Sequence, residues 1–374
     1  MKKFILIDHE PWIKNSKTFL KPFEEAHIPH EVWNISGLVH KNLIVDNSVN
    51  MPEGSKSISD INEFISCLDS EDCSNLAIIE YFPRIWSTRK ILKELSIRKV
   101  PSIRIENYGN CFSPKIPYVN QILHLSIKEL FYKIISKSKH CLFELYTRYN
   151  KIPPRLFVLS SNATQFRTHA YNNPDYENYR FNNQLPIIQS DYLVFCDIYF
   201  PYHPDIQILY GSKYKMTGEH YYYLMNKVFA TLEDKYKIPV IIAAHPKSDY
   251  RGDEFNGRKI IKYQTNNLVC NSKGVILHQS ASLSYTILYD KPLILINIDD
   301  FNVYPILRNI VKRQAEFIGH DYYDINSDFN DWDTLKLEKI NENIRHEYIY
   351  KYLTSRETEN IPNYITLKRI LSSL

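Results

Sequence analysis

Glycine is scarce in this chain, which has only nine glycines among its 374 residues. The sequence contains neither G-x-G-x-x-G nor G-x-x-x-x-G-K-S/T, the loops that hold phosphates in dinucleotide-binding and P-loop proteins. Both of those protein classes are therefore disfavoured. A phosphate bound by this chain would have to be held by side chains and helix ends.

Cysteine pairs and long apolar runs are also missing. None of the six cysteines stands in a C-x-x-C pair, which favours reduced thiols over disulfides or zinc ligands. No run approaches the roughly 20 apolar residues of a membrane-spanning helix. The first apolar run, Phe4–Ile7, meets Asp8 at once and is typical of a strand rather than a signal peptide. We therefore expect a cytoplasmic protein.

Strong charge and metal-ligand spacing are absent as well. The net charge of +4 is slight, whereas dedicated nucleic-acid binders concentrate much more positive charge. The histidines lack H-x-x-x-H spacing, and no D-x-D flanked by apolar residues occurs. We predict a protein with no nucleic-acid partner and no metal or other cofactor.

What the chain does have is a regular alternation of apolar runs and helical segments. In the first half the expected strands are Phe4–Ile7, Leu76–Glu80, Ser102–Glu106 and Leu156–Ser160, and the expected helices are Trp86–Ile97 and Gln121–Tyr149. This βα alternation predicts a parallel sheet.

The second half repeats the pattern after a polar, turn-rich segment at Tyr171–Asn178. Its expected strands are Asp191–Asp197, Val240–Ala244, Arg258–Ile261, Gly274–Leu277 and Leu293–Ile296, with a helix from Thr217 to Tyr236. We predict an α/β protein with two Rossmann-like domains facing a cleft, at residues 1–185 and 186–335. The remaining residues, 336–374, are expected to form helices that pack back toward the first domain.

Two of the second-half strands run into histidines. One leads into His245, and the other leads into His278 and then into serines at the start of an expected helix. Ligands of open parallel sheets bind at the carboxyl ends of the strands, and helix N-termini favour anions. The predicted phosphate site consists of His245, Pro246, Lys247, His278, Ser280 and Ser282. Ser284 lies a full turn into that helix and is expected to face the core.

Other strand ends supply further candidates. Asp197, His203 and Asp205 follow a second-half strand and are expected to contact a sugar or base at the cleft. The acids at first-half strand ends are Asp8, Glu10, Glu80 and Glu106. Such a carboxylate can deprotonate an acceptor hydroxyl as a general base.

A basic stretch lies between residues 128 and 155. Its cations stand among Leu, Phe and Tyr, and they are Lys128, Lys133, Lys137, Lys139, Arg148, Lys151 and Arg155. Two interpretations stay open, a surface for an anionic membrane or lipid-linked acceptor and an ordinary solvated helix face.

The two strand-end motifs resemble a known pair. Ala244-His245-Pro246-Lys247 and His278-Gln279-Ser280-Ala281-Ser282 are similar to the motifs that hold the nucleotide phosphate in bacterial GT-B glycosyltransferases with CMP-activated acidic sugars. These are the sialyltransferase, polysialyltransferase and capsule Kdo-transferase groups. Their acidic D/E-D/E-G motif has its nearest match in Glu106-Asn107-Tyr108-Gly109, which has one acid and one additional residue before the glycine.

This resemblance implies a GT-B glycosyltransferase with an acceptor-binding first domain and a nucleotide-sugar-binding second domain. It would move an acidic sugar, such as Kdo or another nonulosonic acid, from CMP to a glycan or lipid-linked glycan hydroxyl. The product would be surface polysaccharide or lipopolysaccharide, made in peripheral contact with the cytoplasmic face of the inner membrane. His245 and the serines would stabilise the leaving CMP, and Glu106 would be the base, with Asp8 and Glu10 as alternatives.

Two other functions remain open. The first is a GT-B transferase that uses a UDP-, GDP- or dTDP-sugar, in which Lys247 and Arg251 would hold the diphosphate. The second is a non-catalytic module that binds a sugar nucleotide or a glycan. Donor hydrolysis in the absence of an acceptor separates an enzyme from such a module.

Overall fold

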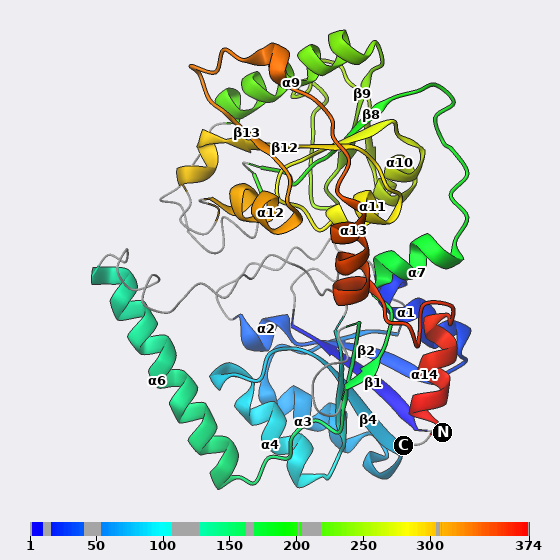
Figure 1. The fold of residues 1–374 in the computed structure, drawn as a ribbon. Helices are drawn as coiled ribbons and strands as arrows, with labels where there is room; N and C mark the ends of the chain where they lie inside the picture. The colour runs from blue at the N-terminus through cyan, green and yellow to red at the C-terminus, as the bar shows by residue number, and fades with distance from the viewer. Residues whose placement is uncertain are drawn as a thin grey trace. The chain divides into compact units, whose positions relative to one another are not determined.

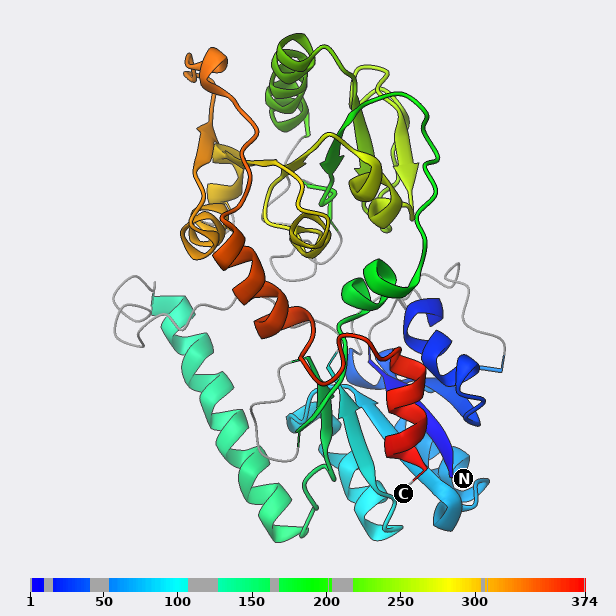
Figure 2. The same ribbon diagram turned by 45° about the vertical axis from the view of Figure 1, so that its right-hand side comes forward.

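The computed structural model describes residues 2–9, 16–40, 54–106, 127–161, 168–200, 202–203, 218–303, 307, 309–372 and 374. The described residues form two compact units, drawn in Figure 1 and, turned, in Figure 2. The first unit holds the described residues up to Pro174 together with Thr354–Leu374. The second unit runs from Asp175 to Leu353.

The first unit is built on a parallel sheet of seven strands. Across the sheet the order is β3 (Lys56–Ser57), β2 (His30–Asn34), β1 (Lys3–Asp8), β4 (Leu76–Tyr81), β5 (Ser102–Ile105), β6 (Val158–Ser160) and β7 (Thr168–Ala170). The chain moves from β1 outward to β3 and then crosses to β4, so the β1–β4 pair is the topological switch point.

Helices cover both faces of this sheet, which explains why its central strands are apolar without alternation. The side chains of Phe4 and Leu6 join one core cluster, and those of Ile5 and Ile7 join another. The first cluster includes α1 (Ser16–Glu25) and α14 (Asn363–Leu371). The second includes α3 (Ile61–Asp69), α4 (Arg89–Ile97) and α6 (Ile127–Tyr149). The shorter elements are α2 (Ser36–Val39), η1 (Cys73–Asn75) and η2 (Trp86–Thr88).

The second unit has a six-stranded parallel sheet around one apolar core. Its order is β10 (Ile260–Lys262), β9 (Val240–Ala244), β8 (Leu193–Cys196), β11 (Gly274–Leu277), β12 (Leu293–Ile298) and β13 (Tyr322–Ile325). Its helices are α7 (Pro174–Phe181), α9 (Glu219–Tyr236), α10 (Thr265–Asn271), α11 (Leu283–Leu288), α12 (Ile310–Ile318) and α13 (Glu342–Tyr348). Short turns complete it at η4 (Asp299–Val303), η5 (Trp332–Thr334) and η6 (Ile349–Leu353).

The predicted α/β architecture of two Rossmann-like domains is confirmed, but the boundaries differ. The predicted boundary at residue 185 lies beyond the observed one at Pro174. Residues 336–353 stay with the second unit, and only Thr354–Leu374 joins the first. Among the helices that the structure describes, none has the length and apolar composition of a transmembrane segment.

A buried asparagine explains how the C-terminal segment joins the first unit. The Asn172 side chain donates to the carbonyls of Thr358 and Ile361, both at 3.0 Å, and accepts from the Thr354 hydroxyl at 2.6 Å. Its backbone exchanges two further hydrogen bonds with the Asn363 side chain. The polar, turn-rich segment Tyr171–Asn178 therefore contains a buried polar centre of the first unit.

We predict that Asn172→Ala destabilises the first unit. The substitution removes three side-chain hydrogen bonds and leaves the Ile361 carbonyl without this donor, and a buried polar group left unsatisfied costs about 1–3 kcal/mol. The unfolding midpoint should fall by roughly 10 °C, measured by thermal unfolding. Asn183→Ala, at an exposed asparagine, is the control and should leave the midpoint unchanged. Equal midpoints for both variants would contradict the role of Asn172.

Candidate functional site

The candidate site of the second unit lies at the carboxyl ends of three neighbouring strands. The chain moves from β8 outward to β10 and then returns to β11 on the other side of β8, so the switch point lies between β8 and β11. Cys196 of β8 pairs with Ala243 of β9 and Leu277 of β11. The loops that begin at Asp197, His245 and His278 therefore start at the same edge.

The Asp197 carboxylate organises the first two of these loops. It accepts hydrogen bonds from the backbone N–H of Tyr199 at 2.8 Å, the backbone N–H of His245 at 3.1 Å and the Tyr250 hydroxyl at 2.6 Å. Only 5% of the residue is exposed. Burial raises the pKa of Asp197 to about 6, although these hydrogen bonds oppose the shift. This corrects the expectation that Asp197 contacts a ligand, because the carboxylate is enclosed and positions the loop.

The half-buried His245 side chain has a defined tautomer. Its Nδ1 accepts a hydrogen bond from the Lys247 backbone N–H at 3.1 Å, so a neutral ring carries its proton on Nε2. The ring packs against that of His203, with centroids 4.7 Å apart. A neutral imidazole held in this way presents an N–H donor to a phosphate oxygen. Pro246 is exposed and Lys247 is half-buried on the same loop.

His278 lies in the core, which corrects the prediction that its ring faces a phosphate. The side chain is completely buried. Its Nδ1 lies 2.6 Å from the Ile296 carbonyl and its Nε2 lies 3.0 Å from the Tyr221 hydroxyl. Burial lowers the pKa of His278 to about 4, so the ring is neutral at neutral pH, with Nδ1 donating and Nε2 accepting. His278 therefore packs β11 against its neighbours.

The serines after β11 have separate roles. The Ser280 hydroxyl accepts from the Ser282 backbone N–H at 3.1 Å, and both side chains are half-buried. Ser284 is buried, as expected, and donates to the Ala281 carbonyl and the Asp175 carboxylate. The shortness of α11 limits any contribution from its dipole, so Ser280 and Ser282 stay phosphate candidates through their hydroxyls.

The candidate acids of the first unit also have separate roles, and Glu80 is a structural residue. Glu80 is fully buried at the end of β4, with Arg84 and Arg155 each 2.6 Å from its carboxylate. Burial alone would raise the pKa of Glu80, but the two guanidinium groups hold it below its usual value. Glu80 is thus a structural ion pair. Arg155 belongs to this ion pair and not to the predicted basic surface.

Glu106 and Asp8 occupy the carboxyl edge of the first sheet. Glu106 follows β5, is exposed, and has its carboxylate 3.7 Å from the Arg104 Nε atom. Asp8 ends β1 at the switch point and is half-buried. Two histidines that were not predicted as site residues, His9 and His40, also lie near Asp8. The distance between His9 Nδ1 and His40 Nε2 is 3.1 Å. The signal was a histidine directly after the first strand.

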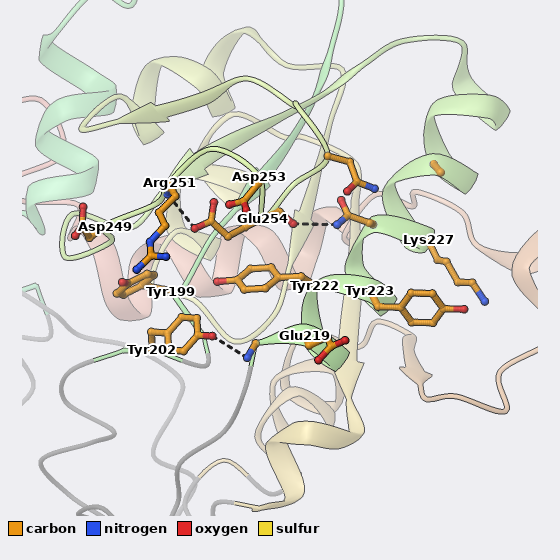
Figure 3. A pocket seen from close by; sticks show the side chains of 14 residues that line it. Tyr199, Tyr202, Glu219, Tyr222, Tyr223, Lys227, Asp249, Arg251, Asp253 and Glu254 are labelled. Atoms are coloured by element: carbon orange, nitrogen blue, oxygen red, sulfur yellow. Dashed lines mark hydrogen bonds between the residues drawn. The ribbon is translucent and has the colours of Figure 1, made fainter.

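A cavity of about 1030 Å³ opens in the second unit between α9 and the loops after β8 and β9. Tyr199, Tyr202 and Tyr222 line it with Asp249 and Arg251, as Figure 3 shows. Aromatic rings among charged groups suit a sugar or a base. Of the residues predicted to hold a phosphate, only Arg251, from the diphosphate alternative, is among the described residues that line this cavity. This cavity was not predicted, because nothing in the sequence distinguishes Tyr199, Tyr202 and Tyr222 from the other tyrosines among the 29 in the chain.

Three other candidates lie outside the described residues, namely Glu10, Asp205 and the segment after Glu106 at residues 107–109. Thr217, the first residue of the expected helix Thr217–Tyr236, also lies outside them, and Gly218 precedes α9 in the structure.

One group of potential metal ligands is present among the described residues. His220 Nδ1 lies 3.0 Å from Asp300 and 3.9 Å from Asp299, and one ligand atom of each residue lies within 4.8 Å of the others. The second ring nitrogen of His220 lies 3.0 Å from the Ser327 hydroxyl. His220 thus has hydrogen-bond partners in Asp300 and Ser327, whereas Asp299 Oδ1 is buried without one among the described residues. Metal independence stays a prediction.

Comparison with solved structures identifies the same two-domain architecture elsewhere. A calicheamicin glycosyltransferase is 8% identical, with 100% of this chain and 98% of that chain covered and a TM-score of 0.52. A UDP-GlcNAc 2-epimerase of Methanocaldococcus jannaschii is 10% identical over 100% of both chains, with a TM-score of 0.46. A glycosyltransferase of Streptomyces sp. SF2575 is 8% identical over 100% of both chains, with a TM-score of 0.43. No protein-family model and no curated protein matches the sequence. The likeness to the calicheamicin enzyme shows the fold, which is of the GT-B type.

We predict that the stability of Asp197→Asn relative to wild type depends on pH. The folded pKa of about 6 exceeds the unfolded value of about 3.9, so Asp197 stabilises the folded state below pH 4 and this contribution falls between pH 4 and 6. The free energy of unfolding of wild type minus that of the variant should decrease by about 3 kcal/mol between pH 4 and 6 and then stay constant. Urea unfolding at successive pH values measures it.

Asp249→Asn is the matched control, because Asp249 is an exposed carboxylate on the loop after β9. The difference in the free energy of unfolding between wild type and Asp249→Asn should not show this decrease between pH 4 and 6. A difference for Asp197→Asn that grows between pH 4 and 6 would show that the carboxylate is not held as described.

Proposed function

We propose that the protein is a glycosyltransferase that transfers a sugar from a nucleotide-activated donor to a glycan hydroxyl. The observation that carries this proposal is the fixed tautomer of His245 at the carboxyl edge of β9, near the switch point of a GT-B fold. Its Nε2–H, with the hydroxyls of Ser280 and Ser282, supplies neutral donors for a departing phosphate.

The proposed reaction is a displacement at the anomeric carbon of the donor sugar. The bond from this carbon to the phosphate oxygen breaks, and its electron pair stays on the leaving nucleotide. The acceptor hydroxyl oxygen forms the new bond and loses its proton to a carboxylate, for which Glu106 is the first candidate. Preorganised donors at the leaving phosphate stabilise charge that develops in the transition state.

A nucleoside diphosphate sugar, with UDP first, is the donor class that we propose. The loop after β9 carries two cations, Lys247 and Arg251, which suit a diphosphate. UDP-GlcNAc also occurs in the name of the Methanocaldococcus jannaschii epimerase reported above. A CMP-linked acidic sugar is the second candidate, favoured by the resemblance of the His-Pro and serine motifs to CMP-sugar transferases.

The remaining expectations concern the acceptor and the place of the reaction. We propose a surface polysaccharide or lipopolysaccharide glycan as acceptor, modified in the cytoplasm without a metal. These proposals rest on the resemblance to CMP-sugar transferases. A result that contradicts them leaves the proposed transfer reaction standing.

We predict that UDP raises the melting temperature more than CMP, GDP or dTDP at equal concentration. A ligand at 100 times its Kd stabilises the folded protein by about 2.7 kcal/mol, so the nucleotide that binds most tightly gives the largest rise in melting temperature. A larger shift with CMP would overturn the UDP proposal and favour the CMP-linked acidic sugar. With the identified donor and no acceptor, wild type should hydrolyse it slowly, and His245→Ala should do so about 10²-fold more slowly.

His320→Ala is the matched control for the histidine variant. His320 precedes β13 at the opposite edge of the same sheet, and it should keep the wild-type rate. Nucleotide binding with no hydrolysis or transfer by wild type would indicate a binding module instead of an enzyme. EDTA should leave the rate unchanged if catalysis is independent of metal.

We predict that Glu106→Gln binds the nucleotide normally but loses about 10²–10⁴-fold in transfer rate, the usual contribution of a general base. The amide keeps the size of the side chain and removes its basicity. Initial rates with donor and acceptor across pH measure the loss, and the ionisation seen in wild type should vanish in the variant. Asp8→Asn, Glu10→Gln and His9→Gln are the comparison variants.

If Glu106→Gln is active and one comparison variant is inactive, that residue is the base. Activity in all four variants would show that no first-unit base is needed and would favour a retaining mechanism.

A further inference from the structure

The helix α6 presents an apolar stripe on the side away from the core of the first unit. Ile134, Leu142, Leu145 and Tyr149 are 56%, 50%, 62% and 88% exposed. Their spacing of eight, three and four residues places them along one side of the helix. Figures 1 and 2 both show α6 at the outer side of this unit.

The opposite side of α6 already has its partners. Phe143 is buried in the core cluster with α3 and α4, and the Tyr146 ring lies 6.0 Å from that of Trp86. These contacts hold the helix on the unit without the exposed stripe. The stripe is therefore not needed to attach α6, and its exposure has a cost that an amphipathic surface helix normally avoids.

Basic side chains flank the stripe. Lys139 and Arg148 are exposed on α6, and Lys151 is exposed just beyond its end. None of these three forms an ion pair with a residue that the structure describes. Glu144 is the exposed acid between them. The side chains of Lys128 and Lys133, which were predicted for this surface, lie outside the described part of the structure.

The combination of apolar stripe and basic flanks selects the partner. A second copy of α6 would cover the apolar side chains but would bring like charges together at its flanks. A nucleic acid would match the cations but leave the leucines exposed. An anionic bilayer satisfies both, because apolar side chains enter the acyl boundary while Lys and Arg extend to the headgroups.

We propose that the outer side of α6 is a docking surface for an anionic lipid bilayer. The helix lies in the plane of the interface, with Leu142 and Leu145 inserted and with Tyr149 at the headgroup level. Lys139, Arg148 and Lys151 contact the acidic headgroups. This inference does not depend on the proposed transfer reaction, since the surface belongs to the first unit and the His245 loop belongs to the second.

Co-sedimentation of the full chain with lipid vesicles tests the proposal. Vesicles of phosphatidylcholine with phosphatidylglycerol at 3:1 should bind the protein, and vesicles of phosphatidylcholine alone should bind it at least tenfold more weakly. Each cation near an anionic surface contributes about 1 kcal/mol, so Arg148→Gln with Lys151→Gln should weaken binding by roughly tenfold or more. Leu142→Ser with Leu145→Ser should weaken it to a similar extent.

Matched variants on other helices of the same unit control for net charge and for hydrophobicity. Lys368→Gln with Arg369→Gln removes two exposed cations from α14. Ile97→Ser with Ile365→Ser removes two exposed apolar side chains, which are 60% and 44% exposed. Both control pairs should bind the anionic vesicles as wild type does. Thermal unfolding confirms that each variant is folded.

Three results would overturn the proposal. The first is no binding to the anionic vesicles, and the second is equal loss in the α6 and control variants. The third is a stable dimer in light scattering that Leu142→Ser with Leu145→Ser dissociates, because a second copy would then cover the stripe. Donor hydrolysis in solution should be the same in the α6 variants and in wild type, so failure of the docking surface and failure of the proposed enzyme are distinguishable.

Discussion

The buried carboxylate of Asp197 is the constraint on which the candidate site depends. Removing a carboxylate from water costs several kcal/mol unless donors replace the water. Here the donors come from the loop after β8 and from two points on the loop after β9. Because His245 and Tyr250 donate to the same oxygen, the second loop must fold back at this place. The orientation of the His245 ring follows from that turn.

Glu80 shows how the same kind of sequence position leads to a different state. Asp197 directly follows β8 and Glu80 is the penultimate residue of β4, and both are removed from solvent. The partners of Asp197 are uncharged, so burial dominates and raises its pKa, whereas guanidinium groups keep Glu80 ionised. Because burial raises the pKa of Asp197 to about 6, its contribution to the stability of the folded state is largest below pH 4 and falls as the pH rises to 6. The ion pair at Glu80 makes the end of β4 insensitive in that range.

The sequence was sufficient for the central strands and insufficient for the polar contacts between them. Runs such as Val240–Ala244 are recognisable because both faces of each sheet are covered, so every side chain is apolar. The strand β2 (His30–Asn34) was not predicted, since its polar residues interrupt that pattern. The sequence also gives no sign of the role of Asn172, which lies in a polar, turn-rich segment and is buried by hydrogen bonds to residues about 190 positions later.

The two histidines of the predicted phosphate site illustrate the same limit. Each follows an apolar strand, and local sequence does not separate them. Tyr221, from a helix earlier in the chain, accounts for the burial of His278, while the neighbouring Lys247 N–H fixes His245. The Tyr221 contact is set by tertiary packing, which a strand pattern does not contain, whereas the Lys247 contact belongs to the local turn after β9.

The proposed site also separates binding from catalysis by charge. Lys247 and Arg251 are cations on a loop, and in the proposed function they would attract a nucleotide whether or not its sugar bond is breaking. Interactions that are equal in the ground state and the transition state do not accelerate the chemical step. A neutral N–H donor held in place by Asp197 and Lys247 adds little to the charge already present, but its hydrogen bond strengthens as the leaving oxygen gains charge. In this proposal the loop cations hold the donor, and the imidazole that the buried carboxylate orients stabilises its departure.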